Sequence, residues 1–273
     1  MRNRLVATFL FSVLVATRAE AQFNVPAPAP GENFHVEVGL MFWAPTPELK
    51  LQTGALSGLG QVDLVQEFGF ENTRFMEFRA VIKPGRKHKI RIAHVPFEYG
   101  RQVPLQRPIV FGGLTLPAGV PVASNVKWDL WRFGWEWDFV AADRGLFGLI
   151  TEIKRNQVTA DIGTPLLGTE AIDVTAPILA LGAIARIYPH RNFSVTVEFT
   201  GFKVFGFIRT VSEAFVDDLE AKTYDVDLYG TYNFGSHVGI QGGYRSVTAE
   251  YLIEDNSGDM KMKGWYFGGL ARF

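Results

Sequence analysis

The last fourteen residues, Met260 to Phe273, place the strongest constraint on what this chain can fold into. Side chains alternate between the two faces of a β-strand. One face therefore collects small and apolar residues: Trp265, Phe267, Gly269, Ala271 and Phe273. Chain termini usually fray, so a soluble protein rarely ends on a half-buried aromatic strand. A β-barrel that spans a membrane must close on its last strand, because lipid tolerates no open strand edge.

The first residues have the three parts of a secretory signal. Arg2 and Arg4 supply positive charge, and an apolar stretch follows over residues 5–16. Small residues at positions 19 and 21 then mark a cleavage site after Ala21. The apolar stretch is about a dozen residues, too short for a membrane core of ~30 Å. We therefore expect a signal peptide over residues 1–21, a Pro/Ala-rich periplasmic linker over residues 22–33, and one domain over residues 34–273.

Composition narrows the classes of function. Hydrophobic residues make up 47% of the chain and aromatic residues 14%, and there are 28 Gly, which suits one all-β domain. The formal net charge of -1 gives no bulk attraction for nucleic acid. The absence of Cys excludes disulfides, thiolate metal sites and a Cys nucleophile. We expect no cofactor, no metal and no nucleic-acid partner.

Alternation of apolar and polar residues predicts about ten strands. The expected ranges are residues 34–44, 74–83, 89–99, 126–140, 146–158, 176–188, 193–203, 222–234, 238–251 and a closing strand from about residue 260. The pattern is clearest over residues 126–140, where Trp131, Phe133 and Trp135 share one face. Such a density of aromatic side chains favours a lipid-facing surface, since Trp and Tyr gather at membrane interfaces.

Four local features modify this pattern. Pro45 and Pro47 are expected to end the first strand, because proline lacks the N–H that a ladder uses. The alternation slips near Ala93 and His94, which predicts a β-bulge. Residues 62–68 are expected to form a helical turn. Residues 109–116 are expected to form a small projecting hairpin.

The connections alternate in length. Those near residues 84, 142, 190 and 235 are short, and those at residues 45–73, 100–125, 160–175 and 205–220 are long. On the long side only the last connection, near residue 256, is short. Transmembrane barrels have an even number of strands, short periplasmic turns and longer extracellular loops. The sequence thus predicts an all-β, antiparallel, up-and-down transmembrane barrel of about ten strands. Eight or twelve remain open if a weak strand is misassigned or the hairpin joins the wall.

The strand pattern and the C-terminal strand resemble those of small bacterial outer-membrane β-barrels of the OmpA/OmpW type. The residues that carry the resemblance are Trp265, Phe267, Gly268, Ala271 and Phe273. The resemblance implies insertion by the barrel-assembly machinery into the outer membrane of a Gram-negative-type bacterium. It also implies contact with lipid and lipopolysaccharide. We expect a monomer, because the outward face is committed to lipid. Ala271 is smaller than usual, and Arg272 is charged and faces inward.

Charged residues recur at positions that the alternation places inside the barrel. They are Glu37, Glu77, Arg79, Arg132, Glu136, Asp138, Glu152, Lys154, Arg186, Glu198, Asp225, Asp227, Arg245 and Arg272. Barrels of about eight strands are just filled by their side chains. We expect these charges to pair across the interior and block it, with Arg245 as a partner for Asp225 and Asp227. A narrow polar pore or a ligand site is the alternative.

These observations favour a structural or surface-interaction barrel, with residues 45–73 and 100–125 as the contact surface. A narrow channel for small polar solutes is one alternative. Another is an outer-membrane hydrolase with His94 as its base, but no local protease or lipid-deacylase motif is present, so we favour a non-enzymatic role. A fourth possibility is an exported soluble barrel, which would have an apolar interior and a polar exterior.

Overall fold

A computed structural model describes residues 29–52, 62–70, 73–111, 114–164, 168–203, 219–253 and 256–273. The expected signal peptide, most of the linker and nearly all of the expected loop at 205–220 lie outside the described residues. Among the described residues, no helix is both long enough and apolar enough to cross a membrane.

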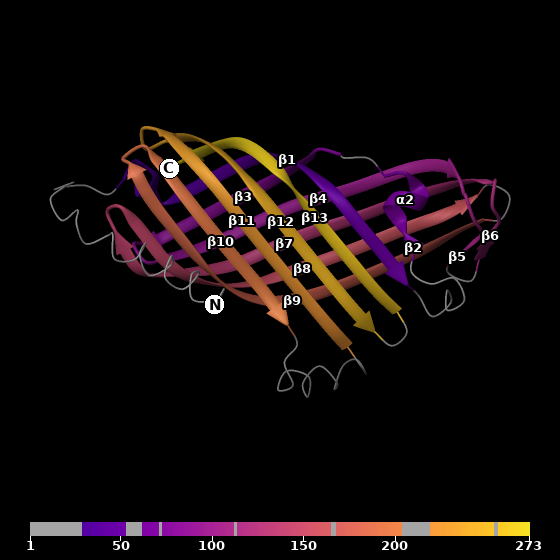
Figure 1. The fold of residues 1–273 in the computed structure, drawn as a ribbon. Helices are drawn as coiled ribbons and strands as arrows, with labels where there is room; N and C mark the ends of the chain where they lie inside the picture. The colour runs from indigo at the N-terminus through magenta and orange to yellow at the C-terminus, as the bar shows by residue number, and fades with distance from the viewer. Residues whose placement is uncertain are drawn as a thin grey trace, which may run out of the picture.

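Ten long antiparallel strands form the wall of a closed barrel (Figure 1). They are β1 (Val36–Gln52), β3 (Phe75–Gly85), β4 (His88–Pro104), β7 (Pro121–Ala142), β8 (Gly145–Thr164), β9 (Gly168–His190), β10 (Phe193–Lys203), β11 (Leu219–Phe234), β12 (Val238–Ile253) and β13 (Asn256–Arg272). Each pairs with the next wall strand, and β13 pairs with β1 from Arg272↔Glu37 to Ser257↔Gln52. The predicted ten-stranded antiparallel barrel is confirmed.

Smaller elements decorate the two ends of this wall. A 3₁₀ turn, η2 (Pro30–Glu32), precedes β1, and the short β2 (Val62–Asp63) pairs with the far end of β1. The helix α2 (Leu64–Phe68) falls inside the range predicted for a helical turn. The strands β5 (Ile109–Phe111) and β6 (Leu114–Leu116) pair as the predicted hairpin.

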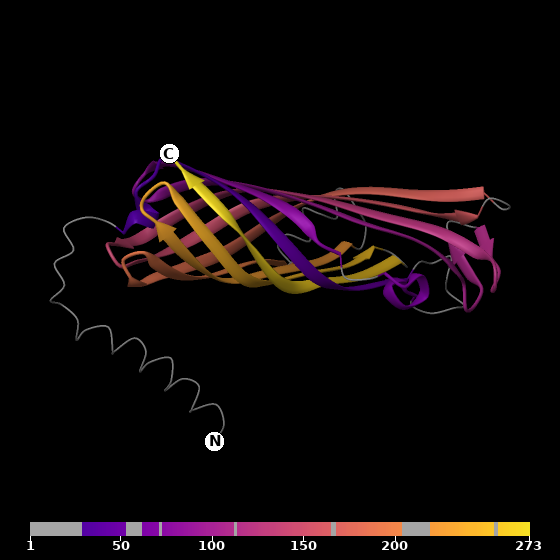
Figure 2. The same cartoon turned by 90° about the horizontal axis from the view of Figure 1, so that it is seen from above.

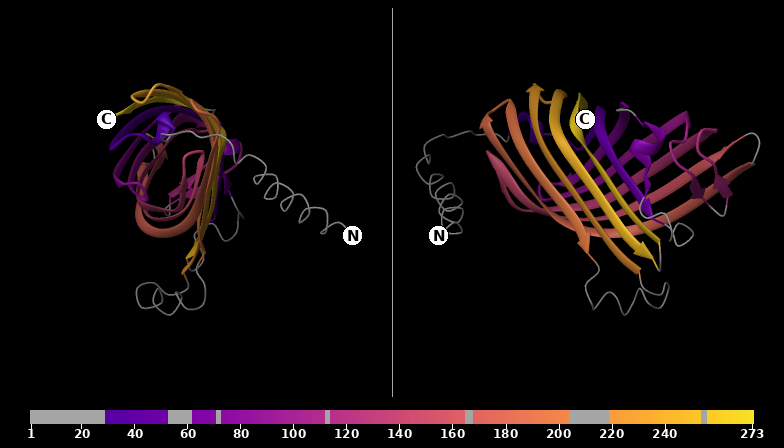
Figure 3. Two further views of the ribbon diagram at one scale, coloured as in Figure 1. Left: turned by 90° about the vertical axis from the view of Figure 1, so that its left-hand side faces the viewer. Right: turned by 45° about the vertical axis from the view of Figure 1, so that its right-hand side comes forward.

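The two ends of the barrel differ in construction. One end, here called the turn end, carries the short connections β3–β4, β7–β8, β9–β10 and β11–β12 together with η2 and Phe273 (Figures 1 and 3). The other, the loop end, carries α2 and the β5–β6 hairpin. The turn end therefore carries only short connections, as the sequence pattern indicates. The loop end carries the long connections and also two short ones, with three residues between β8 and β9 and two between β12 and β13.

β1, β4 and β13 have 17 residues each, whereas a transmembrane strand needs about 9–11. The longest wall strands are the neighbours β7, β8 and β9, with 22, 20 and 23 residues, which lie beside β4 in the sheet. The far halves of β4, β7, β8 and β9 extend beyond the other strands at the loop end, as Figure 2 shows. We call this extension the blade, and it comprises residues 95–104, 121–130, 155–164 and 168–178. The loops expected at 100–125 and 160–175 are therefore largely strand, which corrects the sequence prediction.

Pro45 and Pro47 do not end β1, contrary to expectation. Val36 and Phe273 exchange both of their backbone hydrogen bonds, so every second residue from Val36 onward bonds toward β13. Residues 45 and 47 are out of phase with this series and point to the other edge of β1. On that edge β3 has already ended, at the pair Trp43↔Phe75. The missing N–H groups thus cost the ladder nothing.

The expected bulge at Ala93 and His94 is also wrong. The register of β4 runs without interruption through both residues, against β3 and against β7. The irregular positions lie elsewhere, between Ile82 and Gly85, between Trp137 and Val140, and between Phe193 and Val195. What changes at His94 is the environment of the two faces.

The polarity of the wall inverts at this level. On the turn-end side, β7 points Phe133 and Trp135 outward with nearly half of each side chain exposed, while the charged Glu136 is buried inside. On the loop-end side, β7 points the exposed Lys127 outward and buries Trp128 inside. The first pattern suits a wall in lipid, and the second suits a sheet in water. The sequence reading applied the first pattern to whole strands and so mistook the inversion for a bulge.

An aromatic core fills the loop-end half of the interior. The ring of Phe97 lies 4.6 Å from Trp128, 4.9 Å from Phe75 and 5.5 Å from Trp43, measured between ring centroids. Phe70, which follows α2, packs on Tyr99 at 5.5 Å and joins the helix to this core. The other buried members include Met41, Leu49, Phe68, Val95, Leu105, Leu116, Val122, Val126, Leu130, Ile162, Val247 and Met262. These side chains fill the interior on the loop-end side of the half whose outward face is apolar.

Candidate functional site

The turn-end half of the interior holds an extensive network of ion pairs. Among the described residues it contains nine acidic and nine basic side chains. The acidic set is Glu32, Glu37, Glu77, Glu136, Asp138, Glu152, Glu198, Asp225 and Asp227. The basic set is Arg79, Lys83, Lys89, Arg91, Arg132, Lys154, Arg186, Arg245 and Arg272. Every interior charge named from the sequence lies in this network, whose signs balance.

The network has a loop-side layer centred on Arg245, which is fully buried. Its guanidinium donates two hydrogen bonds to the carboxylate of Asp225, at 3.0 and 2.8 Å, and a third to Glu77 at 2.7 Å. Paired donation of this kind is the strongest geometry for Arg and carboxylate. Although the strand register sets Arg245 opposite Asp227, its side chain reaches Asp225.

Asp227 finds its partner on the other side of the interior. Arg79 donates to Asp227 at 3.1 Å and to Glu77 at 2.9 Å, and its guanidinium lies 4.8 Å from the ring centre of Tyr266. The Tyr266 hydroxyl donates to Asp227 at 2.9 Å. Asp225 and Asp227 therefore each have a separate cationic partner. Among the described residues, no three His, Asp or Glu side chains stand close enough together to hold a metal ion.

Arg132 completes the loop-side layer. It donates to both carboxylate oxygens of Glu152, and its Nη1 lies 3.3 Å from Asp225. The hydroxyl of Thr200 donates to Glu152 at 2.7 Å. The ammonium of Lys154 lies 3.2 Å from Glu152 and 3.5 Å from Asp225. These contacts link four wall strands through one group of side chains.

A turn-side layer is organised by Lys89 and Arg91, both on β4. The ammonium of Lys89 lies 2.7 Å from Glu136 and 2.8 Å from Asp138. Arg91 bridges Glu136 at 3.1 Å and Glu198 at 2.5 Å. Sequence reasoning missed both cations. The available signal was the outward pair Ile90 and Ile92, which places the odd-numbered residues of β4 inside once no bulge is assumed.

Glu32 enters the turn-side layer from outside the wall. It belongs to η2, in the segment that the sequence reading treated as a linker. Its carboxylate receives hydrogen bonds from Lys83 at 2.9 Å, Arg186 at 2.6 Å and the Tyr188 hydroxyl at 3.0 Å. No strand periodicity covers residues 29–33, so no pattern in the sequence predicts an interior residue there.

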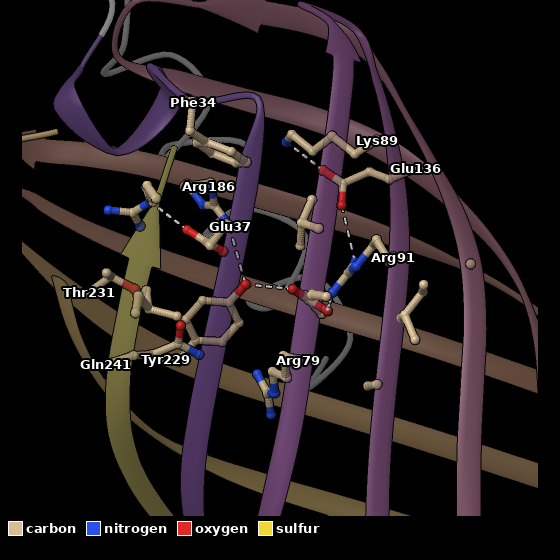
Figure 4. Close-up of a pocket in the computed structure, with 18 of the residues that line it drawn as sticks. Phe34, Glu37, Arg79, Lys89, Arg91, Glu136, Arg186, Tyr229, Thr231 and Gln241 are labelled. Carbon is tan, nitrogen blue, oxygen red and sulfur yellow. Dashed lines mark hydrogen bonds and ion pairs between the residues drawn. The ribbon is translucent and has the colours of Figure 1, made fainter. Parts of the chain in front are cut away.

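A cavity of about 60 Å³ lies between the two layers (Figure 4). Its lining includes Arg79, Arg91, Arg132, Arg186, Glu198 and Tyr229. This volume holds roughly four water molecules. The Nε of Arg79 is buried and makes no hydrogen bond to protein, and the buried Nη1 of Arg91 makes none beyond its ion pair with Glu136. Polar walls of this kind hold water, so we interpret the cavity as a small hydrated chamber inside a filled barrel.

His94, the candidate base, lies on the outward face of β4 at the level of the polarity inversion. Its Nε2 is 2.9 Å from the carboxylate of Asp129, and its ring stacks on Trp131 at 4.2 Å between centroids. Neither contact is with a hydroxyl nucleophile. The interior carboxylates belong to the opposite face of the wall, so the structure does not bring them together with His94.

The residues of the proposed insertion signal lie on the closing strand as follows. Trp265, Phe267 and Phe273 point outward and are about 70% exposed, at 72%, 67% and 72%. Gly268 faces inward against β1, where an added Cβ would lie 2.0 Å from the carbonyl oxygen of Leu40. Ala271 lies beside Val38 on the outward face. Only glycine fits the close approach of β13 to β1 at position 268.

No known protein family matches the sequence, and no curated protein matches it. Solved structures do match the fold. The outer-membrane protease OmpT of Escherichia coli superposes with a TM-score of 0.56 at 9% identity, over 89% of this chain and 97% of that one. The attachment invasion locus protein Ail of Yersinia pestis matches with a TM-score of 0.35 at 11% identity, over 87% and 98%. OprG of Pseudomonas aeruginosa matches with a TM-score of 0.37 at 8% identity, over 89% and 98%.

The likeness to OmpT supports the fold class. The chain shares the barrel architecture of OmpT along nearly its whole described length, and it resembles outer-membrane β-barrels in fold. At 9% identity the likeness to OmpT shows a shared fold and is no evidence for a shared activity.

Proposed function

We propose that this protein is an integral outer-membrane barrel whose turn end faces the periplasm and whose loop end faces the outside. Two features of the structure and one sequence prediction support this placement. The turn-end half of the wall presents large apolar side chains outward on its strands, with charges inside. The turn end has only short connections and the loop end has all of the long ones, as in transmembrane barrels. The expected signal peptide supplies the export step.

We further propose that the barrel is closed and acts through its surface. The observation that carries this proposal is that the interior is filled at two successive levels. The charge network occupies the turn-end half, and the aromatic core occupies the loop-end half. A cavity of about 60 Å³ between the ion layers is too small for a solute larger than a few waters.

The blade is the proposed contact surface. Its outward face is polar and of mixed charge, with Glu98 and Lys127 paired at 3.2 Å and Gln157 donating to Asp173 at 3.5 Å. Its inward face is occupied by the aromatic core. A rigid sheet that extends beyond the membrane in this way presents polar side chains to partners at the cell surface.

Lipid contacts complete the proposal. The outward band suits the acyl chains of the membrane, and the outward polar rim at the β1–β13 seam carries Lys50, Lys261 and Lys263. Cations at this height suit the phosphates of lipopolysaccharide. We propose a monomer, inserted by the barrel-assembly machinery through Trp265, Phe267 and Phe273.

The alternatives have less support. A channel for small polar solutes would need a path through both the charge network and the aromatic core. A hydrolase built on His94 would need a nucleophile or activated water beside it, and its contacts are Asp129 and Trp131.

Planar-bilayer conductance of refolded mature protein tests the closed interior. We expect no steady conductance from protein that shows the heat-dependent gel shift of a folded barrel. Steady, salt-dependent conductance would contradict the proposal and favour a channel. Altered ion selectivity in Arg132→Ala or Asp225→Ala would then locate the constriction.

A further inference from the structure

Four donors from the barrel wall converge on one carboxylate at the turn end. Oε1 of Glu32 accepts from Arg186 at 2.6 Å and from the Tyr188 hydroxyl at 3.0 Å. Oε2 accepts from Lys83 at 2.9 Å, with Lys89 at 3.9 Å. Both oxygens of one planar group are thus served by separate sets of donors.

This arrangement belongs to the wall and not to the segment that fills it. Lys83 lies on β3, Lys89 on β4, and Arg186 and Tyr188 on β9, on another part of the barrel wall. The side chains of Lys83 and Lys89 are 9% and 3% exposed, and Tyr188 is equally buried. Glu32 alone comes from the chain before β1.

The segment that delivers Glu32 is fitted closely into the turn end. Ala29 is 2% exposed, and the backbone carbonyl of Glu32 accepts a second hydrogen bond from Lys83 at 2.8 Å. At Gly31 an added Cβ would lie 2.8 Å from the Tyr188 hydroxyl and 2.9 Å from Asn233. A side chain at position 31 would therefore push the segment out.

The local charge favours a monoanion. Lys83, Lys89 and Arg186 contribute three positive charges, and Lys89 also serves Glu136 and Asp138. One positive charge is left for Glu32 or for its replacement. The two neighbouring carboxylates would repel a dianion such as hydrogen phosphate.

We propose that the turn end of the barrel contains a binding site for a small carboxylate, formed by Lys83, Lys89, Arg186 and Tyr188, which Glu32 occupies as a tethered plug. A free carboxylate would compete with Glu32 from the compartment at the turn end. The tether gives Glu32 an effective concentration in the millimolar range or above, so a weak ligand needs a high concentration to displace it. The site is independent of the surface role of the blade.

Chemical rescue tests the site directly. Glu32→Ala opens a carboxylate-sized space, and we expect the temperature of the heat-dependent gel shift to fall by several degrees in sodium chloride. Sodium acetate at the same ionic strength should restore at least half of that loss, and it should leave wild type unchanged. Glu48→Ala is the matched control, because Glu48 pairs with Lys263 on the exposed face and leaves no enclosed space.

Two outcomes of the rescue would overturn the proposal. Equal stability of Glu32→Ala in acetate and in chloride would mean that the four donors bind no free carboxylate. Equal rescue by sulfate or phosphate would mean that the donors bind anions without preference for a monoanionic carboxylate.

A second measurement does not depend on the folding of Glu32→Ala. The chain has no Cys, so Ala29→Cys provides a unique thiol in the buried part of the plug. In refolded protein we expect it to react with a maleimide at least tenfold more slowly than the exposed control His237→Cys in chloride. Molar acetate should accelerate only the Ala29→Cys reaction, several-fold. A rate for Ala29→Cys that is the same in acetate and chloride would overturn displacement of the plug.

Discussion

At the scale of single residues, burial decides which charges matter. An ion pair in a low-dielectric interior costs several kcal/mol per ion to desolvate, and only good geometry offsets that cost. The network meets this requirement because nearly every buried carboxylate has two or more donors. The exposed pairs, such as Glu48 with Lys263, contribute little to stability, because solvent screens them.

Removing the charge of Arg245 should therefore be costly. Arg245→Met leaves Glu77 and Asp225 buried without their main donor, so we expect a loss of about 3–5 kcal/mol in the free energy of unfolding. Lys263→Met, which breaks an exposed and solvent-screened pair, should cost far less than Arg245→Met. Urea unfolding in lipid vesicles measures both, and equal losses would contradict the structural role of Arg245. Adding Asp225→Asn should recover part of the loss.

The plug should be sensitive to acid. Burial alone would raise the pKa of Glu32, but Lys89, Arg186 and Lys83 outweigh it and hold the pKa well below the ordinary value of 4.5. A carboxyl with a lowered pKa in the folded state contributes stability above its unfolded pKa and loses it as pH falls. Wild type should thus exceed Glu32→Gln in stability at pH 6, and the difference should shrink below about pH 4.5. A difference that stays constant from pH 6 to pH 3 would contradict this account.

At the scale of the strand, β4, β7 and β8 each pass through two environments. Their outward face is apolar in the turn-end half and polar in the loop-end half. The sequence could predict where strands lie, because alternation marks a strand in lipid and in water alike. It could not predict how far they extend, because the apolar face changes sides within β4, β7 and β8. The inward Val95 and Phe97 follow the outward Ile90 and Ile92 without a change of register, so the series read as a slip. Pro45 and Pro47 led to a wrong end for β1, because the effect of a proline depends on whether the strand edge that it faces is paired.

The two faces of β7 allow a matched comparison. Trp128 is 3% exposed in the aromatic core, and Trp135 is 47% exposed on the outward face. Trp128→Ala should cost about 3–5 kcal/mol through lost burial and the cavity left behind. Trp135→Ala should cost clearly less, because lipid refills the space. Equilibrium unfolding of the two variants in vesicles decides the matter, and the reverse order would contradict the assignment of faces.

At the scale of the whole molecule, the turn-end half is a barrel with an apolar exterior, as suits lipid. It continues into a loop-end half with a polar exterior, as suits water. Class, strand number and most interior charges could be predicted, because they follow from local alternation. The pairing of those charges could not, since Arg245 bonds Glu77 across 168 residues of sequence. The plug could not be predicted either, because Glu32 has no strand pattern around it. An apolar interior with a polar exterior, which seemed the mark of a soluble barrel, describes the loop-end half.

Orientation in the membrane can be tested on whole cells. Lys127→Cys places a thiol on the outward face of the blade, and His237→Cys places one at the turn end; both positions are exposed. A membrane-impermeant maleimide should label Lys127→Cys on intact cells and His237→Cys only after the outer membrane is permeabilised. Labelling of His237→Cys alone on intact cells would mean the opposite orientation.

The pairing of β1 with β13 also determines when the barrel can close during assembly. Its ion pair between Glu37 and Arg272 joins residues 235 positions apart. Contacts between such distant parts of a chain require the loop-closure entropy to be lost before any contact energy is gained, so they slow folding. The cylinder cannot be sealed until its final strand has been delivered, so every earlier intermediate has two bare edges. Export and insertion must shield those edges for the entire time that the rest of the polypeptide takes to arrive.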